Sequence, residues 1–234
     1  MRHDSCVLVA NLNRIRSDIA EYSKNPEKVT LLAVSKYATV EEIQTIFEQG
    51  IDNFAENFIR AAVKKIKRLP NNITWHYTGA LQSSKLKAIV QNFDWVHSLS
   101  SLRHAIKLNS YCRKLKKSIN VLIQINIDMD PQKNGIMPDD QNALSQLLLF
   151  IAKESEHLKL KGFSCMLENT SNPELQRRSF MKMNDLQADI EQNMEIKTEY
   201  LSMGTSSDIK AALLSGSTIV RVGRAIFGQS FETK

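Results

Sequence analysis

The sequence predicts an α/β fold, a single (β/α)8 TIM barrel with an extra helix before the first strand. Short apolar segments alternate eight times with segments of helical periodicity, which is the pattern of parallel strands joined by helices. The segment NVLIQINI (120–127) is apolar on both faces, as expected for a strand that is buried on both sides. The chain has 234 residues, 42% of them hydrophobic, and this length is close to the usual size of the barrel.

A doubly wound open sheet is the other fold that such an alternation allows. The eight predicted units match the strand count of the closed barrel. No GxGxxG motif opens the first unit, which weakens the dinucleotide-binding form of the open sheet. We therefore expect one barrel domain over residues 1–234.

The predicted elements follow one another along the chain without a low-complexity linker. An opening helix is expected at roughly residues 5–22, before the first strand. Thr39 followed by Glu42 forms a capping-box pattern, and Pro173 suits the first turn of a helix. The strand-like runs are 29–36, 52–57, 74–79, 94–98, 120–127, 160–166, 199–204 and 218–223, and the helical patterns between them are 39–49, 57–68, 83–91, 101–117, 138–155, 173–192 and 206–214.

The basic charge of the chain does not by itself predict a nucleic-acid partner. Lys and Arg number 31 against 25 Asp and Glu, a net charge of +6. Part of the excess lies in VKKIKR (63–68) and RKLKK (113–117), where no aromatic residues are interleaved. These runs are typical of solvated helix faces. We expect neither nucleic acid nor a membrane as a partner.

The three cysteines favour a reducing compartment. Cys6, Cys112 and Cys165 are far apart, with no CxxC pair and no metal-like spacing with histidine. The N-terminal apolar run is too short for a signal peptide, and no stretch approaches the length of a membrane span. The sequence therefore predicts a cytoplasmic protein without a metal site.

Lys36 ends the first predicted strand. Leu32, Val34 and Lys36 share parity, so the lysine is expected to continue a row of core-facing side chains. A lysine here can simply mark where the chain reaches water. In a parallel barrel, however, the chemistry lies at the carboxyl ends of the strands, where an amine is well placed for carbonyl chemistry. The segment alone leaves both interpretations open.

Two glycine-containing segments follow the last two predicted strands. LSMGTSSD (201–208) places Gly204 at the end of strand seven, and STIVRVGRAIFG (217–228) places Gly223 at the end of strand eight. The loops after these strands often form the phosphate site of the barrel. Glycine lets the backbone approach a ligand closely, and free N–H groups at a helix N-terminus attract anions.

Ser206 and Arg224 add a hydroxyl group and a positive charge to these loops. We expect Ser206 near the start of a helix and Arg224 directly after strand eight. Tight turns, an N-cap and a solvated arginine would explain each loop separately. Two such loops together with Lys36 have the outline of a cofactor site.

Five segments match a known pattern in their order and spacing over nearly the whole chain. They are AVSK (33–36), FAENF (54–58), HYTGALQSSK (76–85), LSMGTSSD (201–208) and GSTIVRVGRAIFG (216–228). Together they resemble the pyridoxal phosphate homeostasis protein family, also called the YggS/PROSC family. The resemblance implies a barrel of the alanine racemase N-terminal type, without the second, β-rich domain of that enzyme.

The resemblance also implies that pyridoxal 5′-phosphate (PLP) is the cofactor and that it forms an imine with Lys36. No catalytic residue and no metal ligand is implied. Together with the residues of the two glycine-containing loops, the predicted cofactor-binding residues are Lys36, Asn57, Ser202, Met203, Gly204, Ser206, Arg221, Gly223 and Arg224.

Arg221 alternates with Val220 and Val222, so its side chain is able to point into the barrel. By resemblance to the racemase fold, its guanidinium faces the pyridine nitrogen of the cofactor. Arginine stays protonated and offers only donors, so it disfavours a protonated pyridine, and an unprotonated ring is a weak electron sink. A buried structural ion pair is the alternative role.

The remaining site residues each have a second interpretation. Asn57 ends strand two, where it either hydrogen-bonds the ring oxygen of the cofactor or forms a turn. Met203 packs against the ring or only against the core. His76 and His97 lie beside tryptophans in strands and are typical of satisfied core residues, so we assign them no catalytic role. The sequence assigns no function to the family-like Lys85 and Lys133.

Several positions depart from the family pattern. Tyr37-Ala38-Thr39 replaces a polar, proline-containing stretch after the lysine. Ala55 replaces glycine, Ala80 replaces proline and Thr205 replaces methionine. The lysine, the arginine of strand eight and the glycines are all retained, and Tyr37 changes the surroundings of the expected cofactor mouth.

Three functional classes remain. A carrier would bind, buffer and deliver PLP, with apo-enzymes as protein partners. A racemase would need an acid/base group on each face of the substrate. In the related racemase, one of these groups comes from a partner subunit's extra domain, for which 234 residues leave no room. A barrel enzyme that forms a sugar-phosphate imine with Lys36 is the third class. We favour a monomeric carrier without substantial catalysis of its own.

Overall fold

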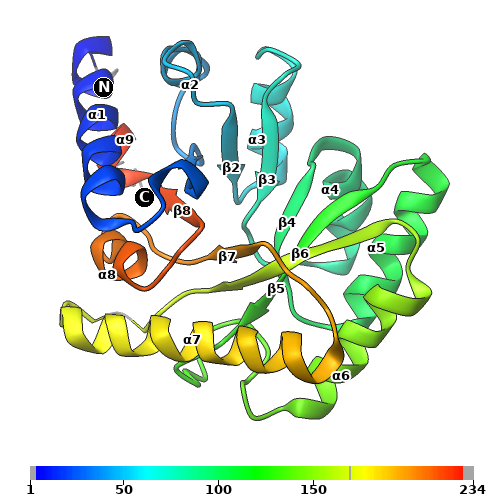
Figure 1. Cartoon of the computed structure of the whole chain (residues 1–234). Coiled ribbons are helices and arrows are strands. Elements are labelled where there is room, and N and C mark those ends of the chain that lie inside the picture. The colour runs from blue at the N-terminus through cyan, green and yellow to red at the C-terminus, as the bar shows by residue number, and fades with distance from the viewer. Residues whose placement is uncertain (1–3, 169, 229–234) are drawn as a thin grey trace.

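Eight parallel strands, hydrogen-bonded in chain order, close into a barrel in the computed structural model (Figure 1). The structure describes residues 4–168 and 170–228. The predicted TIM barrel is therefore confirmed, and the open sheet is excluded. The strands are β1 (Thr30–Val34), β2 (Asn53–Glu56), β3 (Thr74–Tyr77), β4 (Trp95–Leu99), β5 (Ile119–Ile125), β6 (Leu158–Cys165), β7 (Tyr200–Ser202) and β8 (Ile219–Val222).

Helices surround the barrel and connect its strands (Figure 1). The α-helices are α1 (Ser5–Tyr22), α2 (Val40–Glu48), α3 (Ile59–Ile66), α4 (Leu86–Asn92), α5 (Leu102–Leu115), α6 (Gln141–Leu149), α7 (Pro173–Met194), α8 (Ile209–Leu214) and α9 (Arg224–Phe227). Short helical turns add η1 (Pro26–Lys28), η2 (Ser83–Lys85) and the π-helical η3 (Phe150–Glu154). No helix among the described residues is both long and apolar enough to cross a membrane.

Local sequence signals set several helix starts as predicted. Thr39 Oγ1 accepts from the Glu42 backbone N–H at 3.2 Å, and Glu42 Oε2 accepts from the Thr39 N–H at 2.8 Å, which completes a capping box at α2. Asn172 caps α7, with Pro173 in its first turn. The opening helix α1 packs against α2, α8 and α9, and Asn11 Nδ2 donates to the Ile226 carbonyl at 3.0 Å. The extra helix thus covers the place where β8 meets β1.

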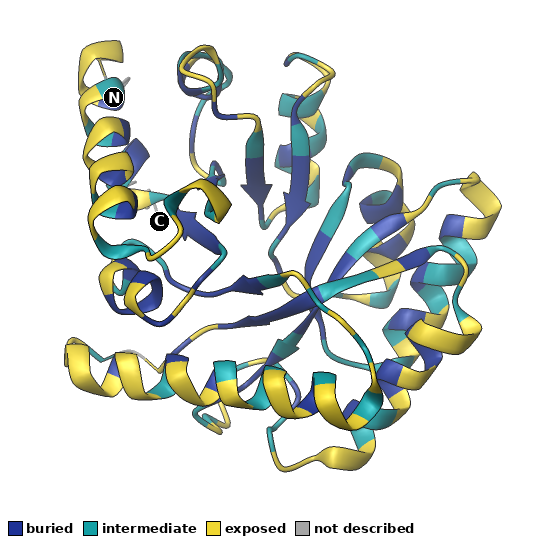
Figure 2. Cartoon of the chain, in the orientation of Figure 1, coloured by how far each residue is buried: buried dark blue, intermediate teal, exposed yellow. Residues whose placement is uncertain are grey.

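Apolar side chains lie on both faces of the barrel wall, in two separate clusters. The larger, outer cluster joins alternate strand residues, such as Ala33 and Phe163, to the inner faces of the helices. The inner cluster consists of Leu32, Ala55, Leu122 and Ile219, with Val34, Trp95 and Tyr200 packed against it. Figure 2 shows the strands mostly buried and the helices exposed on their outer sides. The alternation of strand side chains assigns Leu32, Val34 and Arg221 to the interior.

Three predicted boundaries differ from the structure. The first strand ends at Val34, and Lys36 lies in a turn in which the Ala38 N–H donates to the Ser35 carbonyl at 2.9 Å. The predicted helix 138–155 is divided into α6 and η3. Arg224–Phe227 forms the additional helix α9.

A further difference concerns the start of α8. Ser206 precedes the helix, which begins at Ile209. Asp208 Oδ1 accepts from the Thr205 N–H at 2.5 Å and from Thr205 Oγ1 at 2.8 Å, and these bonds hold residues 205–208 in a turn. Ser206 is therefore not the N-cap of α8.

Candidate cofactor site

Lys36 lies at the carboxyl end of the barrel, in the turn that follows β1. Its side chain is partly buried, and its Nζ lies 4.9 Å from the centroid of the exposed Tyr37 ring. β1 pairs with β2 on one side and with β8 on the other, where Leu32 is opposite Arg221. The lysine is thus next to the ends of two strands that carry other predicted site residues.

A buried network holds the turn that carries Lys36. The hydroxyl of Ser35, which is fully buried, donates to Glu56 Oε1 at 2.8 Å. Lys65 Nζ, from α3, donates to the same oxygen at 2.6 Å and to the Ser35 carbonyl at 2.7 Å. An ion pair that is this well buried persists only with such additional hydrogen bonds. Ser35, Glu56 and Lys65 therefore fix the backbone directly before Lys36.

Sequence reasoning missed this network. Glu56 is part of the quoted segment FAENF, but nothing in the sequence indicates that its partner is Lys65 in the following helix. Glu56 Oε2 is buried and has no hydrogen-bond partner among the described residues. The available signal was the glutamate itself, because an acidic residue at a buried strand position needs a partner.

The loops after β7 and β8 meet. Ser206 Oγ accepts from the Ala225 N–H at 3.2 Å, so the first turn of α9 lies against the loop before α8. Gly204 is buried with a positive φ of 92°, and a Cβ there would lie 2.5 Å from the Cβ of Ala212. The two loops are thus in contact, as a shared phosphate site would need, and Gly204 is required by both its backbone conformation and its packing.

Gly223 lets the end of β8 approach β1. A Cβ at this position would lie 3.1 Å from the Val34 carbonyl oxygen and 3.3 Å from the Val34 Cβ. A larger residue would therefore press against the strand that leads to Lys36. Arg224, the first residue of α9, is exposed to solvent.

Arg221 is a buried cation in the barrel interior, only 7% exposed. Its Nη1 donates to the Ser202 carbonyl and to Ser202 Oγ, and its Nη2 donates to the Cys165 carbonyl at 2.7 Å. In the described part of the chain, none of the ion pairs involves Arg221. Burial lowers its pKa, although an arginine remains charged at neutral pH.

These bonds leave part of the guanidinium for a ligand. A guanidinium has five N–H donors, and the three bonds to Ser202 and Cys165 use three of them. The remaining two, one on Nη2 and one on Nε, have no protein partner among the described residues. The expected alternative of a structural ion pair does not apply to Arg221, because all of its partners are neutral.

The two histidines share the interior with Arg221. His76 Nδ1 and His97 Nε2 are 2.9 Å apart, and His97 Nδ1 is 3.0 Å from Ser202 Oγ. Burial lowers the pKa of His76 to about 3. Burial, followed by the charges of His76 and Arg221, also holds the pKa of His97 well below its ordinary value. Both residues are satisfied core histidines, as the sequence predicted, but they form one network instead of two separate contacts.

Three further predicted site residues differ in burial and in hydrogen bonding: Asn57, Ser202 and Met203. Asn57 is partly buried, and its Oδ1 accepts from Thr78 Oγ1 at 2.6 Å. The Ser202 hydroxyl is occupied by His97 and Arg221. Met203 has no exposed surface and belongs to the outer apolar cluster. Packing accounts for the Met203 side chain, and the cofactor contacts of all three residues stay predictions.

The residues brought together fit the functional groups of PLP. The cofactor presents an aldehyde, a pyridine nitrogen and a phosphate group. Lys36 supplies an amine, Arg221 supplies N–H donors that the protein leaves unused, and the joined loops at Gly204–Ser206 and Gly223–Arg224 supply backbone N–H groups and a hydroxyl. The two N–H groups of Arg221 that no described residue accepts from are suited to a hydrogen-bond acceptor such as a pyridine nitrogen.

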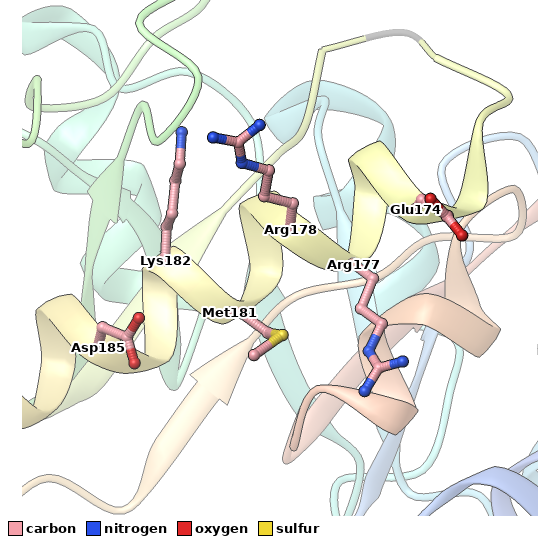
Figure 3. A pocket seen from close by; sticks show the side chains of 6 residues that line it. All are labelled: Glu174, Arg177, Arg178, Met181, Lys182 and Asp185. Atoms are coloured by element: carbon pink, nitrogen blue, oxygen red, sulfur yellow. The ribbon is translucent and has the colours of Figure 1, made fainter.

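A hollow along α7 lies outside this set. Figure 3 shows six side chains from this one helix around it, and all six are exposed. They carry charges of both signs and include no buried polar group, so we assign no site there. They are Glu174, Arg177, Arg178, Met181, Lys182 and Asp185.

The fold and the candidate site define a barrel of the type found in alanine racemase. The family described as "Alanine racemase, N-terminal domain" matches residues 9–231. A curated pyridoxal phosphate homeostasis protein from Pasteurella multocida is 36% identical over 231 residues, covering 93% of this chain and 95% of that protein. One from Haemophilus influenzae is 37% identical over 231 residues, with 93% and 94% covered. The chain belongs to the alanine racemase N-terminal domain family and, within it, to the pyridoxal phosphate homeostasis proteins.

Solved structures support the same assignment. PipY from Synechococcus elongatus PCC7942, solved without PLP, superposes with a TM-score of 0.84 at 30% identity and covers 95% of this chain and 100% of PipY. A second PipY structure, with PLP bound, gives a TM-score of 0.83 at 28% identity, with 94% and 100% covered. Alanine racemase from Clostridium difficile 630 shares the fold alone, with a TM-score of 0.76, 16% identity, and 97% of this chain but 58% of the racemase covered.

Proposed function

We propose that this protein binds PLP as an imine of Lys36 and takes part in PLP homeostasis by buffering and delivering the cofactor. The observation that carries the proposal is that two neighbouring strands carry complementary groups. Lys36 lies at the carboxyl end of β1, and the buried, donor-only Arg221 lies on β8. The relatives named for PLP homeostasis and the PLP-bound structure of PipY support it.

Each functional group of the cofactor has a proposed partner. Lys36 attacks the aldehyde and releases water, and Arg221 donates to the ring nitrogen. The phosphate group lies between the loops at Gly204–Ser206 and Gly223–Arg224, which Ser206 Oγ and the Ala225 N–H already join at 3.2 Å. Asn57 hydrogen-bonds the ring oxygen, while Ser202 and Met203 complete the site near the ring.

We propose that catalysis by this site is not substantial. PLP supplies an electron sink for carbanion chemistry when its ring nitrogen is protonated. Arg221 can only donate, so it keeps this nitrogen unprotonated. The other group beside Lys36 is Tyr37, which comes from the same turn and not from an opposing element. Among the described residues we therefore find no two opposed acid/base groups of the kind that a racemase needs.

Apo-enzymes that use PLP are the partners that a carrier requires. Amines from solvent or from a client can reach a lysine imine at the open end of the barrel, and exchange needs only an amine and an accessible carbon. We further propose that the protein acts in the cytoplasm, on the ground that its three cysteines are free and widely separated. We also propose that it acts as a monomer.

The test combines a spectrum with an isotope-exchange assay. The purified protein, incubated with PLP, should show the visible absorption of a lysine imine, and Lys36→Ala should not. Alanine incubated with the loaded protein in D₂O should keep its α-proton, as followed by NMR. Rapid exchange that requires Lys36 would identify an enzyme of the racemase type and overturn the carrier proposal; a Tyr37→Phe variant would then show whether Tyr37 is the second base.

A further inference from the structure

A continuous chain of hydrogen bonds crosses the barrel interior from β2 to β8. Asn53 Oδ1 is 2.9 Å from His76 Nε2, and His76 Nδ1 is 2.9 Å from His97 Nε2. His97 Nδ1 is 3.0 Å from Ser202 Oγ, which is 2.6 Å from Arg221 Nη1. The five residues come from five strands, and the proposed function uses only the last two of them.

The direction of this chain is fixed at both ends. Arg221 can only donate, so Ser202 Oγ accepts at that end. At the other end, Asn53 Nδ2 donates to Asp52 Oδ1 at 2.7 Å, which turns the amide so that Oδ1 faces His76. Asn53 Oδ1 can only accept, so His76 carries its proton on Nε2.

The two fixed ends determine the position of each proton between them. His76 Nδ1 is then an acceptor, so His97 donates to it from Nε2. His97 Nδ1 is left as an acceptor, and the Ser202 hydroxyl donates to it while accepting from Arg221. With both histidines neutral, every donor in the chain faces an acceptor. A proton added to either ring would place two donors against each other or leave the Ser202 hydroxyl without its acceptor.

The surroundings hold the two rings in place. His76 stacks on Trp95 with ring centroids 5.2 Å apart and meets His97 edge-on at 5.1 Å. The His97 carbonyl accepts from the Ser164 hydroxyl. Both histidines are at most 3% exposed, and burial lowers the pKa values of both. The neutral state inferred from the hydrogen bonds agrees with the burial.

We propose that Asn53, His76, His97 and Ser202 are positioning residues that orient Arg221 toward the cofactor ring. Resting on the proposed function, this inference assigns a role to Asn53, His76 and His97, which the proposed function leaves unused, and a second role to Ser202. The chain occupies Arg221 Nη1 with Ser202 and leaves the N–H groups on Nε and Nη2 for the ring nitrogen. Because its direction cannot be reversed, it does not conduct protons to the ring; it keeps the arginine in one orientation.

The direction of the chain can be measured without the cofactor. Long-range ¹⁵N–¹H NMR of the full, cofactor-free chain at pH 7 should show His76 and His97 both neutral, with the proton on Nε2. A purely structural pair of histidines has no need for this particular tautomer in both rings. A proton on Nδ1 of His97, or an imidazolium at either residue, would overturn the inference.

The effect on the cofactor is tested with Ser202→Ala. This variant keeps the Ser202 carbonyl but removes the link between His97 and Arg221, and we expect about tenfold weaker PLP binding. The ring-nitrogen shift of ¹⁵N-labelled PLP should also move. Ser202→Thr retains the hydroxyl and should restore both values. Ser98→Ala is the matched control, because Ser98 is a buried strand serine that donates outside the chain, to the Gly79 carbonyl at 2.6 Å.

Failure of this inference is distinct from failure of the proposed function. If the wild type retains no PLP on Lys36 after borohydride reduction, the proposed function is wrong. The NMR measurement of the His76 and His97 tautomers then still tests the direction of the hydrogen-bond chain. If the wild type retains PLP but Ser202→Ala matches it in affinity and in ring-nitrogen shift, only the positioning role is wrong. Should Ser202→Ala not fold, the same comparison is made with His76→Gln, which changes the hydrogen-bond chain two residues further from Arg221.

Discussion

The two faces of the barrel wall bury different kinds of side chain. The outer face contributes to one apolar cluster that runs from α1 to α9. In the described part of the chain, the inner apolar cluster has four buried residues, Leu32, Ala55, Leu122 and Ile219. The rest of the described interior includes His76, His97, Ser202 and Arg221.

The outer face of the barrel wall mainly stabilises the fold, whereas the polar residues of the inner face are better explained by function. Burial of apolar surface on the outer face stabilises the fold directly, at about 25 cal/mol per Å². Each polar group on the inner face loses its hydration and must recover that free energy through a partner, so polar residues there add little net stability. The interior polar residues are thus better explained by what they bind and orient than by folding.

The largest expected effect is the loss of covalent cofactor in Lys36→Ala. Without the amine no imine forms, so borohydride reduction followed by peptide mass mapping should find no adduct on the variant. In the wild type the adduct should be on Lys36. Lys133→Ala is the control and should keep the adduct. A label on Lys85 or Lys133 in the wild type, with Lys36 unmodified, would show that the site is misplaced.

The outer face should respond in stability and not in binding. Leu147 on α6 is fully buried in the outer cluster, and Leu147→Ala should lower the free energy of unfolding by about 2–5 kcal/mol. Leu149 on the same helix is 41% exposed, and Leu149→Ala should cost less than about 1 kcal/mol. Denaturant unfolding measures both. If Leu147→Ala also weakened PLP binding in the folded protein, the two faces would not be independent.

The strands and most helices could be predicted because their signals are local. Alternating apolar segments, the Thr39–Glu42 capping box and Pro173 each depend on residues a few positions apart. The meeting of the loops after β7 and β8 followed from the barrel topology, and the bond from the Ala225 N–H to Ser206 Oγ is one consequence. The exact end of β1 was not predictable, because the turn at Lys36 depends on Glu56 and Lys65 holding Ser35.

The interior chain was not predicted because it joins residues that are far apart in the sequence. Ser202 and His97 are 105 positions apart, and each was interpreted alone. A usable signal existed once the barrel was assumed, since inward parity places Asn53, His76 and Arg221 on one face of the wall. Parity gives the face but not the register across eight strands, so the partners needed the structure.

The third effect is a decline of stability in weak acid that originates inside the barrel. Burial lowers the pKa of His76 to about 3, whereas an unfolded histidine has a pKa of about 6.5. The contribution of His76 to the free energy of unfolding is therefore fully present above pH 6.5 and is lost as the pH falls toward the folded pKa. The reason is that the histidine binds a proton in the unfolded chain but stays neutral in the folded one. The expected loss is about 2 kcal/mol for each such histidine between pH 6.5 and 5.

Denaturant unfolding at pH 7 and at pH 5 tests this decline. The wild type should lose stability between the two, and His76→Gln should lose about 2 kcal/mol less over the same interval. The range lies above the usual pKa values of Asp and Glu, so carboxylates contribute little to the difference. An equal loss in both proteins would mean that His76 is protonated in the folded state, against the interior network.

The smallest effect is expected at Arg224, which is exposed at the start of α9, whereas Arg221 three residues earlier is buried. Through solvent its charge should add only about 0.5–1 kcal/mol to the binding of a phosphate, so Arg224→Ala should weaken PLP binding roughly twofold to fivefold. Higher salt should shrink this difference further, because exposed charges are screened. Lys210→Ala is the control, since the Lys210 ammonium lies over the Tyr22 ring, 4.4 Å from its centroid. A hundredfold loss in Arg224→Ala, insensitive to salt, would mean that Arg224 turns inward onto the phosphate and that the loop after β8 belongs with the buried inner face.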